Sequence, residues 1–301
     1  MTKLIVWYGQ LTTPGRLRAR GLAVLSGAVL WLMIFLVLPS LVLVAIAFTQ
    51  PTEYGEIAWR FTLENFHRLL GYGVLQWSAN YLLILARSIW IALVTTVVCL
   101  VLAYPLAFFI AVRPPRIRYL LLALVIIPSC TNLVIRTYAW RLILDAQMPP
   151  AQLAHALGLI PADAALYPGA LAIYLGMVNS FLPMAVLPLY ASVERMDWSL
   201  VEAAQDLYGS KVRVFMHGVL PQTLSGLTAA VILTFIPAMG VFVVPDLLGG
   251  ARYMLAGNLI QQQFFTSHNP AFGAAVSLAL LVLTLIGLFA FRRPGREMDL
   301  A

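Results

Sequence analysis

Long uninterrupted runs of apolar residues dominate the chain. Six stretches lack Asp, Glu, Lys and Arg, and they cover residues 21–50, 88–112, 119–135, 164–193, 218–245 and 269–291. A helix needs about 20 residues to cross a bilayer. We therefore predict six transmembrane helices, at residues 21–49, 88–112, 119–135, 168–193, 218–245 and 270–291. The runs do not alternate as the strands of a membrane barrel do, so the predicted fold class is an all-α polytopic membrane protein.

Composition supports this interpretation. Of the 301 residues, 61% are hydrophobic and 10% are charged, whereas soluble domains carry about 25% charged residues. The chain cannot cover a water-facing surface, which excludes a soluble enzyme, a disordered chain and a small disulfide-rich module. The two cysteines, Cys99 and Cys130, both lie in apolar runs and predict neither a disulfide framework nor a metal site.

The positions of the basic residues predict the orientation. With the N-terminus in the cytoplasm, 13 of the 19 Lys and Arg lie inside and six outside, while the 12 acids divide equally. We therefore expect an N-in/C-in membrane protein. Its parts would be a cytoplasmic segment at 1–20, a bundle of six transmembrane helices at 21–291 and a cytoplasmic tail at 292–301. Contact with lipid headgroups accounts for the net charge of +7, so no nucleic-acid partner is expected.

The first apolar run has about twice the length of a signal-peptide core, and we expect it to remain as a span. Outside the membrane, residues 61–71 predict a short surface helix that Thr62 caps and Gly71 ends. Prolines fall within five of the six predicted spans, and each removes one backbone donor and can kink its helix.

The sequence contains none of the common catalytic or nucleotide-binding motifs. The four histidines are scattered in loops without metal-ligand spacing, so no catalytic, metal or cofactor site is expected on this chain. No predicted span carries a charge near its centre, which a proton-coupled pump usually needs. Uphill transport would therefore take its energy from a partner.

The longest internal connection, residues 194–217, is the most informative segment. It predicts a short amphipathic helix, a break at Gly209, a second short helix, and Pro221 at the start of the next span. Glu202 and Asp206 lie one turn apart on one face of the first helix. Its apolar side chains are expected to face the bilayer or a partner: Val201, Ala204 and Leu207.

This segment resembles the EAA loop of ABC importer permeases. It has Glu202, Ala203 and Ala204, a glycine soon after, and Pro221 preceded by leucine, 19 residues after Glu202. The family usually places its glycine six residues after the glutamate, and that position holds Tyr208, followed by Gly209. The resemblance implies that a cytoplasmic ATPase docks on Glu202, Ala203 and Ala204. Gly209 would form the break, and Pro221 the return to the membrane.

Two further segments, 128–140 and 235–250, resemble the spermidine/putrescine permeases among these importers. Cys130 departs from the aromatic that is common there, and Val241 from the glutamate of some members. The resemblance implies a type I ABC importer permease bundle (MetI-like) in the inner membrane of a bacterium. A polyamine would be held by carboxylates and aromatic faces, and the candidates for its path are Asn132, Arg136, Tyr138, Trp140 and Asp246.

The implied partners are a second permease subunit, two ATPase subunits that hold ATP and magnesium, an extracytoplasmic solute-binding protein and membrane lipid. Three alternatives stay open. The same kind of importer could carry another small amine, an opine, an aminoalkylphosphonate or an anion. A secondary transporter or channel could work alone, and a membrane scaffold could transport nothing.

Overall fold

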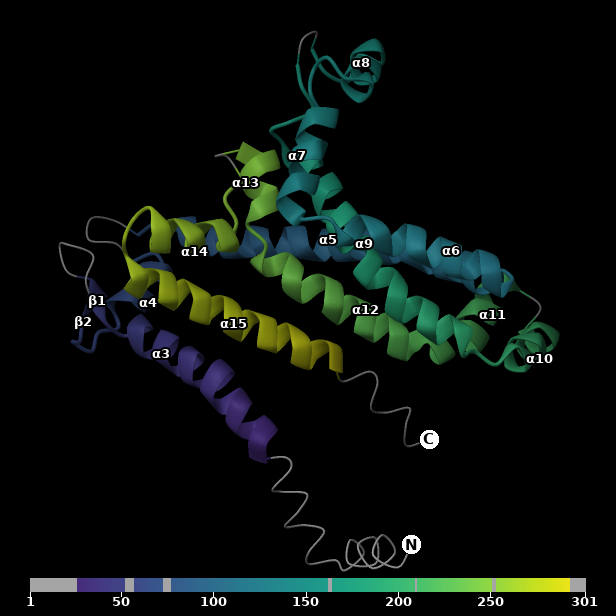
Figure 1. Cartoon of the computed structure of the whole chain (residues 1–301), viewed down its shortest axis with the longest axis horizontal. Helices are drawn as coiled ribbons and strands as arrows, with labels where there is room; N and C mark the ends of the chain where they lie inside the picture. Colours follow the sequence, from purple (N-terminus) through teal and green to yellow (C-terminus); the bar gives the residue numbers. More distant parts are fainter. Residues whose placement is uncertain are drawn as a thin grey trace, which may run out of the picture.

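The computed structural model is a long bundle of helices, and one segment projects from its side (Figure 1). It describes residues 26–51, 57–72, 77–161, 164–208, 210–250 and 253–292. The predicted cytoplasmic segment 1–20 and nearly all of the tail 292–301 lie outside these ranges. Five of the described helices are long and apolar enough to cross a membrane, and a bent pair makes a sixth.

The core of the bundle consists of three long helices, α5 (Asn80–Ala111), α9 (Ala170–Glu194) and α12 (Leu220–Gly240). They pack against one another along much of their length. Fully buried alanines let the backbones come close together: Ala92, Ala103, Ala107, Ala172, Ala185 and Ala230. α5 begins eight residues before the predicted span at 88–112, because Arg87 does not interrupt the helix.

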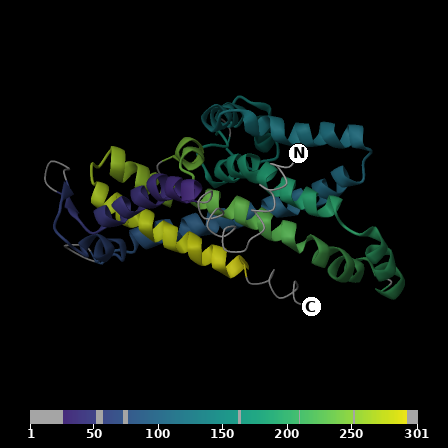
Figure 2. The same cartoon turned by 60° about the horizontal axis from the view of Figure 1, so that its bottom comes forward.

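The first span runs from Ser26 to Ala47 and ends in α3 (Leu38–Ala47). α3 lies along α15 (Pro270–Arg292) in both views (Figures 1 and 2). Most apolar side chains of the span Ser26–Ala47 are exposed, as expected for a helix in contact with lipid. A π-helical turn, η1 (Met33–Val37), precedes Pro39, and the Leu38 N–H donates to the carbonyl of Met33.

The third predicted span, 119–135, is wrong as a single helix. α6 (Pro115–Ile126) continues into a 3-10 turn, η2 (Ile127–Cys130), and stops there. α7 (Leu133–Ile143) then leaves at 95° and, with α8 (Pro149–Ala156), forms the projecting segment (Figure 1). Pro128 within the 3-10 turn and the Asn132 cap of α7 explain why the helix stops and begins again.

The fifth predicted span, 218–245, differs at both ends. Its helix begins at Lys211 with α11 (Lys211–Val214) and continues through a π-helical turn, η3 (Phe215–Val219), into α12. It stops at Gly240, and α13 (Val243–Gly249) is a separate helix. Pro245 lies in the first turn of α13, where a missing backbone donor costs nothing.

Short elements cap the two ends of the bundle. At one end in Figure 1, α4 (Glu64–Leu69) lies beside the two-residue antiparallel strands β1 (Gln50–Pro51) and β2 (Ile57–Ala58). The predicted short helix is present, and Gly71, with a φ of +94°, follows its end. Its N-cap, however, is Leu63 and not Thr62, although the Thr62 hydroxyl accepts a hydrogen bond from Glu64 N. α14 (Ala256–Phe265) precedes α15, and α10 (Trp198–Tyr208) forms the opposite end.

Candidate functional site

Two parts of the structure carry the residues that the sequence singled out. The first is α10, which lies at one end of the bundle (Figure 1). The second is a cavity where α12 breaks and α13 and α14 follow. The long helix α12 runs between the two.

The outer face of α10 is an accessible apolar stripe. Leu200, Ala203 and Leu207 lie one to two turns apart, and Leu200 and Leu207 are 55% and 78% exposed. Glu202 is exposed beside them. An exposed apolar stripe bordered by an acid on a short helix suits a groove in another protein.

The inner face of α10 is used by the chain itself. Val201 and Ala204 are buried in a small cluster with Val214 and Val219, against which Phe108 of α5 packs. A Cβ atom added to Gly218 would lie 2.9 Å from the Cβ of Ala204. Ala204 and Gly218 must both be small, because α10 packs directly against the π-helical turn η3, which continues into α12. Val201 and Ala204 do not face the bilayer or a partner as expected, and only Leu207 of that trio is exposed.

Asp197 holds the start of α10. Its Oδ1 accepts hydrogen bonds from the hydroxyl of Ser199 at 2.8 Å and from the backbone N–H of Ser199 at 2.9 Å. These bonds hold the pKa of the Asp197 carboxyl below its usual range. The cap is consequently present at neutral pH and is lost only as the pH falls through that lowered pKa.

The remaining predicted residues of this loop have different positions. Gly209 lies outside the described residues, between the end of α10 and Ser210. Pro221 is exposed and lies in the first turn of α12, but that turn continues the helix from Lys211. The expectation that a separate second helix precedes Pro221 is therefore wrong, because the π-helical turn η3 carries the helix past the proline.

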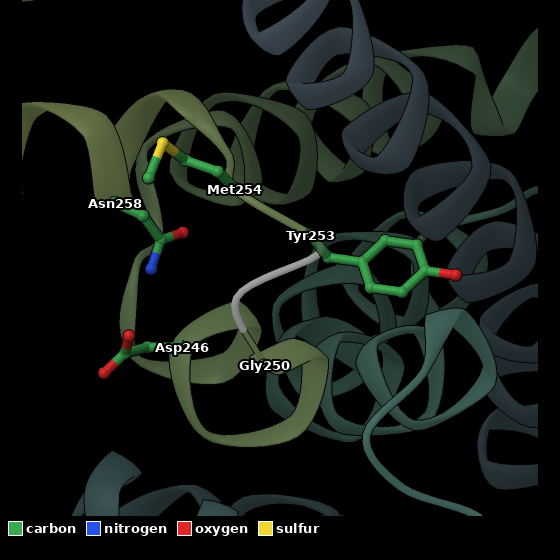
Figure 3. A pocket seen from close by; sticks show the side chains of 5 residues that line it. All are labelled: Asp246, Gly250, Tyr253, Met254 and Asn258. Carbon is green, nitrogen blue, oxygen red and sulfur yellow. The ribbon is translucent and has the colours of Figure 1, made fainter.

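The cavity at the break after α12 has a volume of about 210 Å³ and is lined by Asp246, Gly250, Tyr253, Met254 and Asn258. Asp246 is exposed in the first turn of α13. Its carboxylate and the amide of Asn258 point toward one another, whereas the ring of Tyr253 points away (Figure 3). The cavity therefore presents a carboxylate but no aromatic face from Tyr253.

Asn258 and Gly257 connect α14 to this break. The Asn258 amide donates to the carbonyl of Phe242 at 3.0 Å, and its Oδ1 is buried without a hydrogen-bond partner. A Cβ on Gly257 would lie 2.9 Å from the carbonyl oxygen of Val241. The carbonyls freed by the helix break are thus covered by α14. The amide nitrogen of Asn258 points toward Asp246, whereas its buried Oδ1 points away from that carboxylate (Figure 3).

Two of the path candidates on α7 hold the bend in place. Asn132 caps α7, since its Oδ1 accepts from Val134 N at 2.8 Å. Arg136 donates from Nη1 to the carbonyl of Pro128 at 3.0 Å, which closes the turn before α7. Within the described ranges Arg136 forms no ion pair with Asp246, and the one ion pair found there joins Arg118 to Glu194 at 2.7 Å.

The two aromatic candidates on α7 have different environments. Tyr138 is 47% exposed, whereas Trp140 is half-buried against the main core. α7 packs against α13, so the fold brings the α7 candidates near the helix that carries Asp246. This neighbourhood follows from the 95° bend.

Sequence reasoning missed three residues that matter at these sites: Asn258, Gly218 and Gln222. Asn258 follows the 235–250 segment in the sequence, but nothing in the pattern places it beside Asp246. Gly218 and Gln222 face α10 only because the helix continues from Lys211 through the π-helical turn. In the described part of the chain, no group of three or more His, Cys, Asp or Glu could hold a metal ion.

Comparison with known proteins gives one family. Residues 103–298 match the family described as binding-protein-dependent transport system inner membrane component. The spermidine/putrescine transport system permease protein PotB of Escherichia coli K12 is 37% identical over 269 residues, covering 89% of this chain and 95% of PotB. PotB of Haemophilus influenzae is 34% identical, covering 89% and 92%.

A more distant relative and a solved structure agree with this. The inner membrane ABC transporter permease protein YdcU of E. coli K12 is 29% identical over 229 residues, covering 72% of each chain. A chain of a bacterial ABC transporter involved in the import of the acidic polysaccharide alginate superimposes with a TM-score of 0.64 at 15% identity, covering 97% of this chain and 98% of that one. This likeness concerns the fold.

Proposed function

Because this chain belongs to the family of binding-protein-dependent transport system inner membrane components, we propose that it forms half of the path by which an ATP-driven importer takes up a polyamine. As a family member, the chain is a multi-pass inner-membrane permease subunit of an ABC importer. The proposal adds the solute, the partners and the residues that serve each. The observation that carries it is the 37% identity to a spermidine/putrescine permease along nearly the whole of both chains.

A second, homologous permease subunit would complete the path, and two ATPase subunits would hold ATP and magnesium. A binding protein outside the membrane would deliver the solute. A bacterial alginate ABC transporter of similar fold has been solved in complex with a periplasmic protein that holds an alginate pentasaccharide. The accessible stripe of α10 supports ATPase docking at Leu200, Ala203 and Leu207, with Glu202 beside it. Ala204 would not contact the ATPase; its small side chain would allow α10 to pack against Gly218.

The chemistry of a polyamine suits the cavity at the break after α12. Its ammonium groups carry positive charge at neutral pH and need acceptors. Asp246 offers a carboxylate that forms no ion pair within the described residues. Tyr138 on neighbouring α7 is exposed enough to provide an aromatic face.

Other solutes remain the second candidate. Arg136 would favour an anion such as an opine or an aminoalkylphosphonate, but its Nη1 is already bound to the Pro128 carbonyl. An independently working channel or secondary transporter is disfavoured by the family, whose members work with a binding protein.

Reconstitution of the complete complex in proteoliposomes tests this function. The permease pair, the ATPase and the binding protein would be combined, and uptake of labelled spermidine measured with and without ATP. We expect uptake only when ATP and the binding protein are both present, together with stimulated ATP hydrolysis. Uptake without ATP would contradict the importer assignment, whereas ATP-driven uptake of a different solute would replace the polyamine.

A further inference from the structure

The side chain of Gln222 forms three hydrogen bonds, and two of them join α12 to the residue that precedes α10. Its Oε1 accepts from the backbone N–H of Asp197 at 2.8 Å, and its Nε2 donates to the carbonyl of the same residue at 3.3 Å. Nε2 also donates to the carbonyl of Gly218 at 2.7 Å, one turn earlier in its own helix. One amide thereby binds both backbone groups of the residue that precedes α10.

Only a primary amide of this length can make all three bonds. One end must accept from an N–H while the other donates two hydrogens to carbonyl oxygens. Rotating the amide by 180° would place its oxygen against two carbonyls, so the contacts fix its orientation. A carboxylate would keep one bond and oppose two acceptors, and an apolar side chain would lose all three.

Two further contacts strengthen the connection between α10 and α12. Asp197, whose backbone Gln222 holds, caps α10 through Ser199. One to two turns along α10, Ala204 meets Gly218 so closely that no side chain fits between them. α10 is thus attached to the base of α12 near its start and again near its middle.

The other end of the same helix reaches the cavity. α12 runs without a break from Gln222 to Gly240, and the carbonyl of Phe242 just beyond accepts from Asn258. A helix of about 20 residues transmits displacement along its axis because its hydrogen bonds resist stretching. A movement imposed on α10 would therefore reach the lining of the cavity through α12.

We propose that Gln222 is a positioning residue for energy coupling, which fixes α10 to α12 so that movement of a docked ATPase reaches the cavity beside Asp246. This inference rests on the proposed function and extends it to the connection between the ATPase-docking helix and the solute cavity. Gln222 need touch neither solute nor nucleotide. Its loss should separate ATP hydrolysis from transport without preventing assembly.

The test compares Gln222→Glu and Gln222→Met in the reconstituted four-component complex. Glutamate keeps the shape and removes both donors, and methionine keeps the length and removes every polar contact. Gln147→Glu is the matched control, because that exposed glutamine on the α7–α8 connection makes no side-chain hydrogen bond among the described residues. Three quantities are measured: ATPase retained on the purified permease, basal ATP hydrolysis, and the stimulation of hydrolysis and uptake by spermidine-loaded binding protein.

We expect both Gln222 variants to retain the ATPase and basal hydrolysis, and to lose stimulation and uptake several-fold, while Gln147→Glu behaves as wild type. Full stimulation in both variants would overturn the proposal. Failure of both to assemble would overturn it too, because Gln222 would then serve folding rather than coupling. If the wild-type complex itself shows no stimulation by the loaded binding protein, the proposed function fails instead.

Discussion

At the scale of single residues, neighbouring positions in one motif have opposite roles. Ala203 faces outward from α10, whereas Ala204 is buried against Gly218. A charge placed at Ala204 would be forced into a cluster of valines without a partner. Such a substitution would test the packing of α10 and not its docking, so the docking test belongs on the outward positions.

Asp246→Asn tests the cavity. The substitution preserves shape and removes the negative charge, which weakens a charge-assisted contact worth about 1.5–3 kcal/mol. The KM for spermidine uptake should rise about tenfold or more, with the amount of assembled complex unchanged. The measurement is initial uptake in proteoliposomes against spermidine concentration.

Asp145→Asn is the control for this variant, since Asp145 follows α7 and lies outside the cavity. It should leave the KM near the wild-type value. An unchanged KM in Asp246→Asn would remove Asp246 from the solute path.

At the scale of elements, prolines shape the helices in two ways. Before Pro39 and before Pro221 a π-helical turn widens the helix, and the residue ahead of each proline donates to the carbonyl five positions earlier. The wider turn makes room for the ring, so the helix continues. At Pro128 the helix instead stops, and α7 begins after Asn132 at an angle of 95°. The break beside the cavity lies between Gly240 and Val243, ahead of Pro245 in the first turn of α13.

The exposed stripe of α10 gives a prediction at this scale. Leu207→Glu should reduce the amount of ATPase that co-purifies with the permease several-fold, because a charge would enter an apolar contact. Permease expression and insertion should not change, since Leu207 is 78% exposed and lies outside the buried cluster.

The matched control is Leu159→Glu, a similarly exposed leucine just beyond the end of α8. It should leave ATPase recovery at the wild-type level. Equal recovery in Leu207→Glu would exclude the stripe as the docking surface.

At the scale of the whole molecule, the elongated bundle has two different ends. α10 forms one end, and the β1–β2 pair with α4 forms the other (Figure 1). If α10 meets a cytoplasmic ATPase, the turn between α14 and α15 lies outside the cell membrane. This is the predicted N-in/C-in orientation.

Single cysteines can test this orientation. In a Cys99→Ala, Cys130→Ser background, Ser267→Cys between α14 and α15 should react with a membrane-impermeant maleimide in intact spheroplasts. Ser199→Cys at the start of α10 should react only after permeabilisation. Both native serines are exposed, so access is decided by the membrane alone. Labelling of Ser199→Cys in intact spheroplasts would reverse the assignment.

Much of the fold follows from the sequence because the bilayer imposes a simple rule. A segment of about 20 residues without charge must be helical and must span, since no water is present to satisfy its backbone. Within the described ranges, five spans appear near their predicted positions. The boundaries at Arg87 and Lys211 shift, because a charged residue near an interface does not end a helix.

Other features depend on contacts that no local pattern contains. The Glu202 motif indicates a docking loop, but the division of α10 into a buried and an exposed face depends on Gly218 lying against Ala204. Likewise, Asp246 is visible in the sequence as a lone acid, while Asn258 joins it only because α14 folds back over the broken end of α12.

The sequence by itself determined the class of the protein and the approximate positions of five spans, and it singled out the loop that we propose as the ATPase contact. Charge and hydrophobicity are local properties, and the bilayer acts on them directly. The tertiary structure decided where the third and fifth spans break, which side of α10 is free, and that Gln222 fastens α10 to α12. These depend on close approach between residues far apart in the chain, such as Asp197 and Gln222. The physical reason is that backbone N–H and carbonyl groups must find hydrogen-bond partners, and that close packing needs small side chains on both sides of a contact.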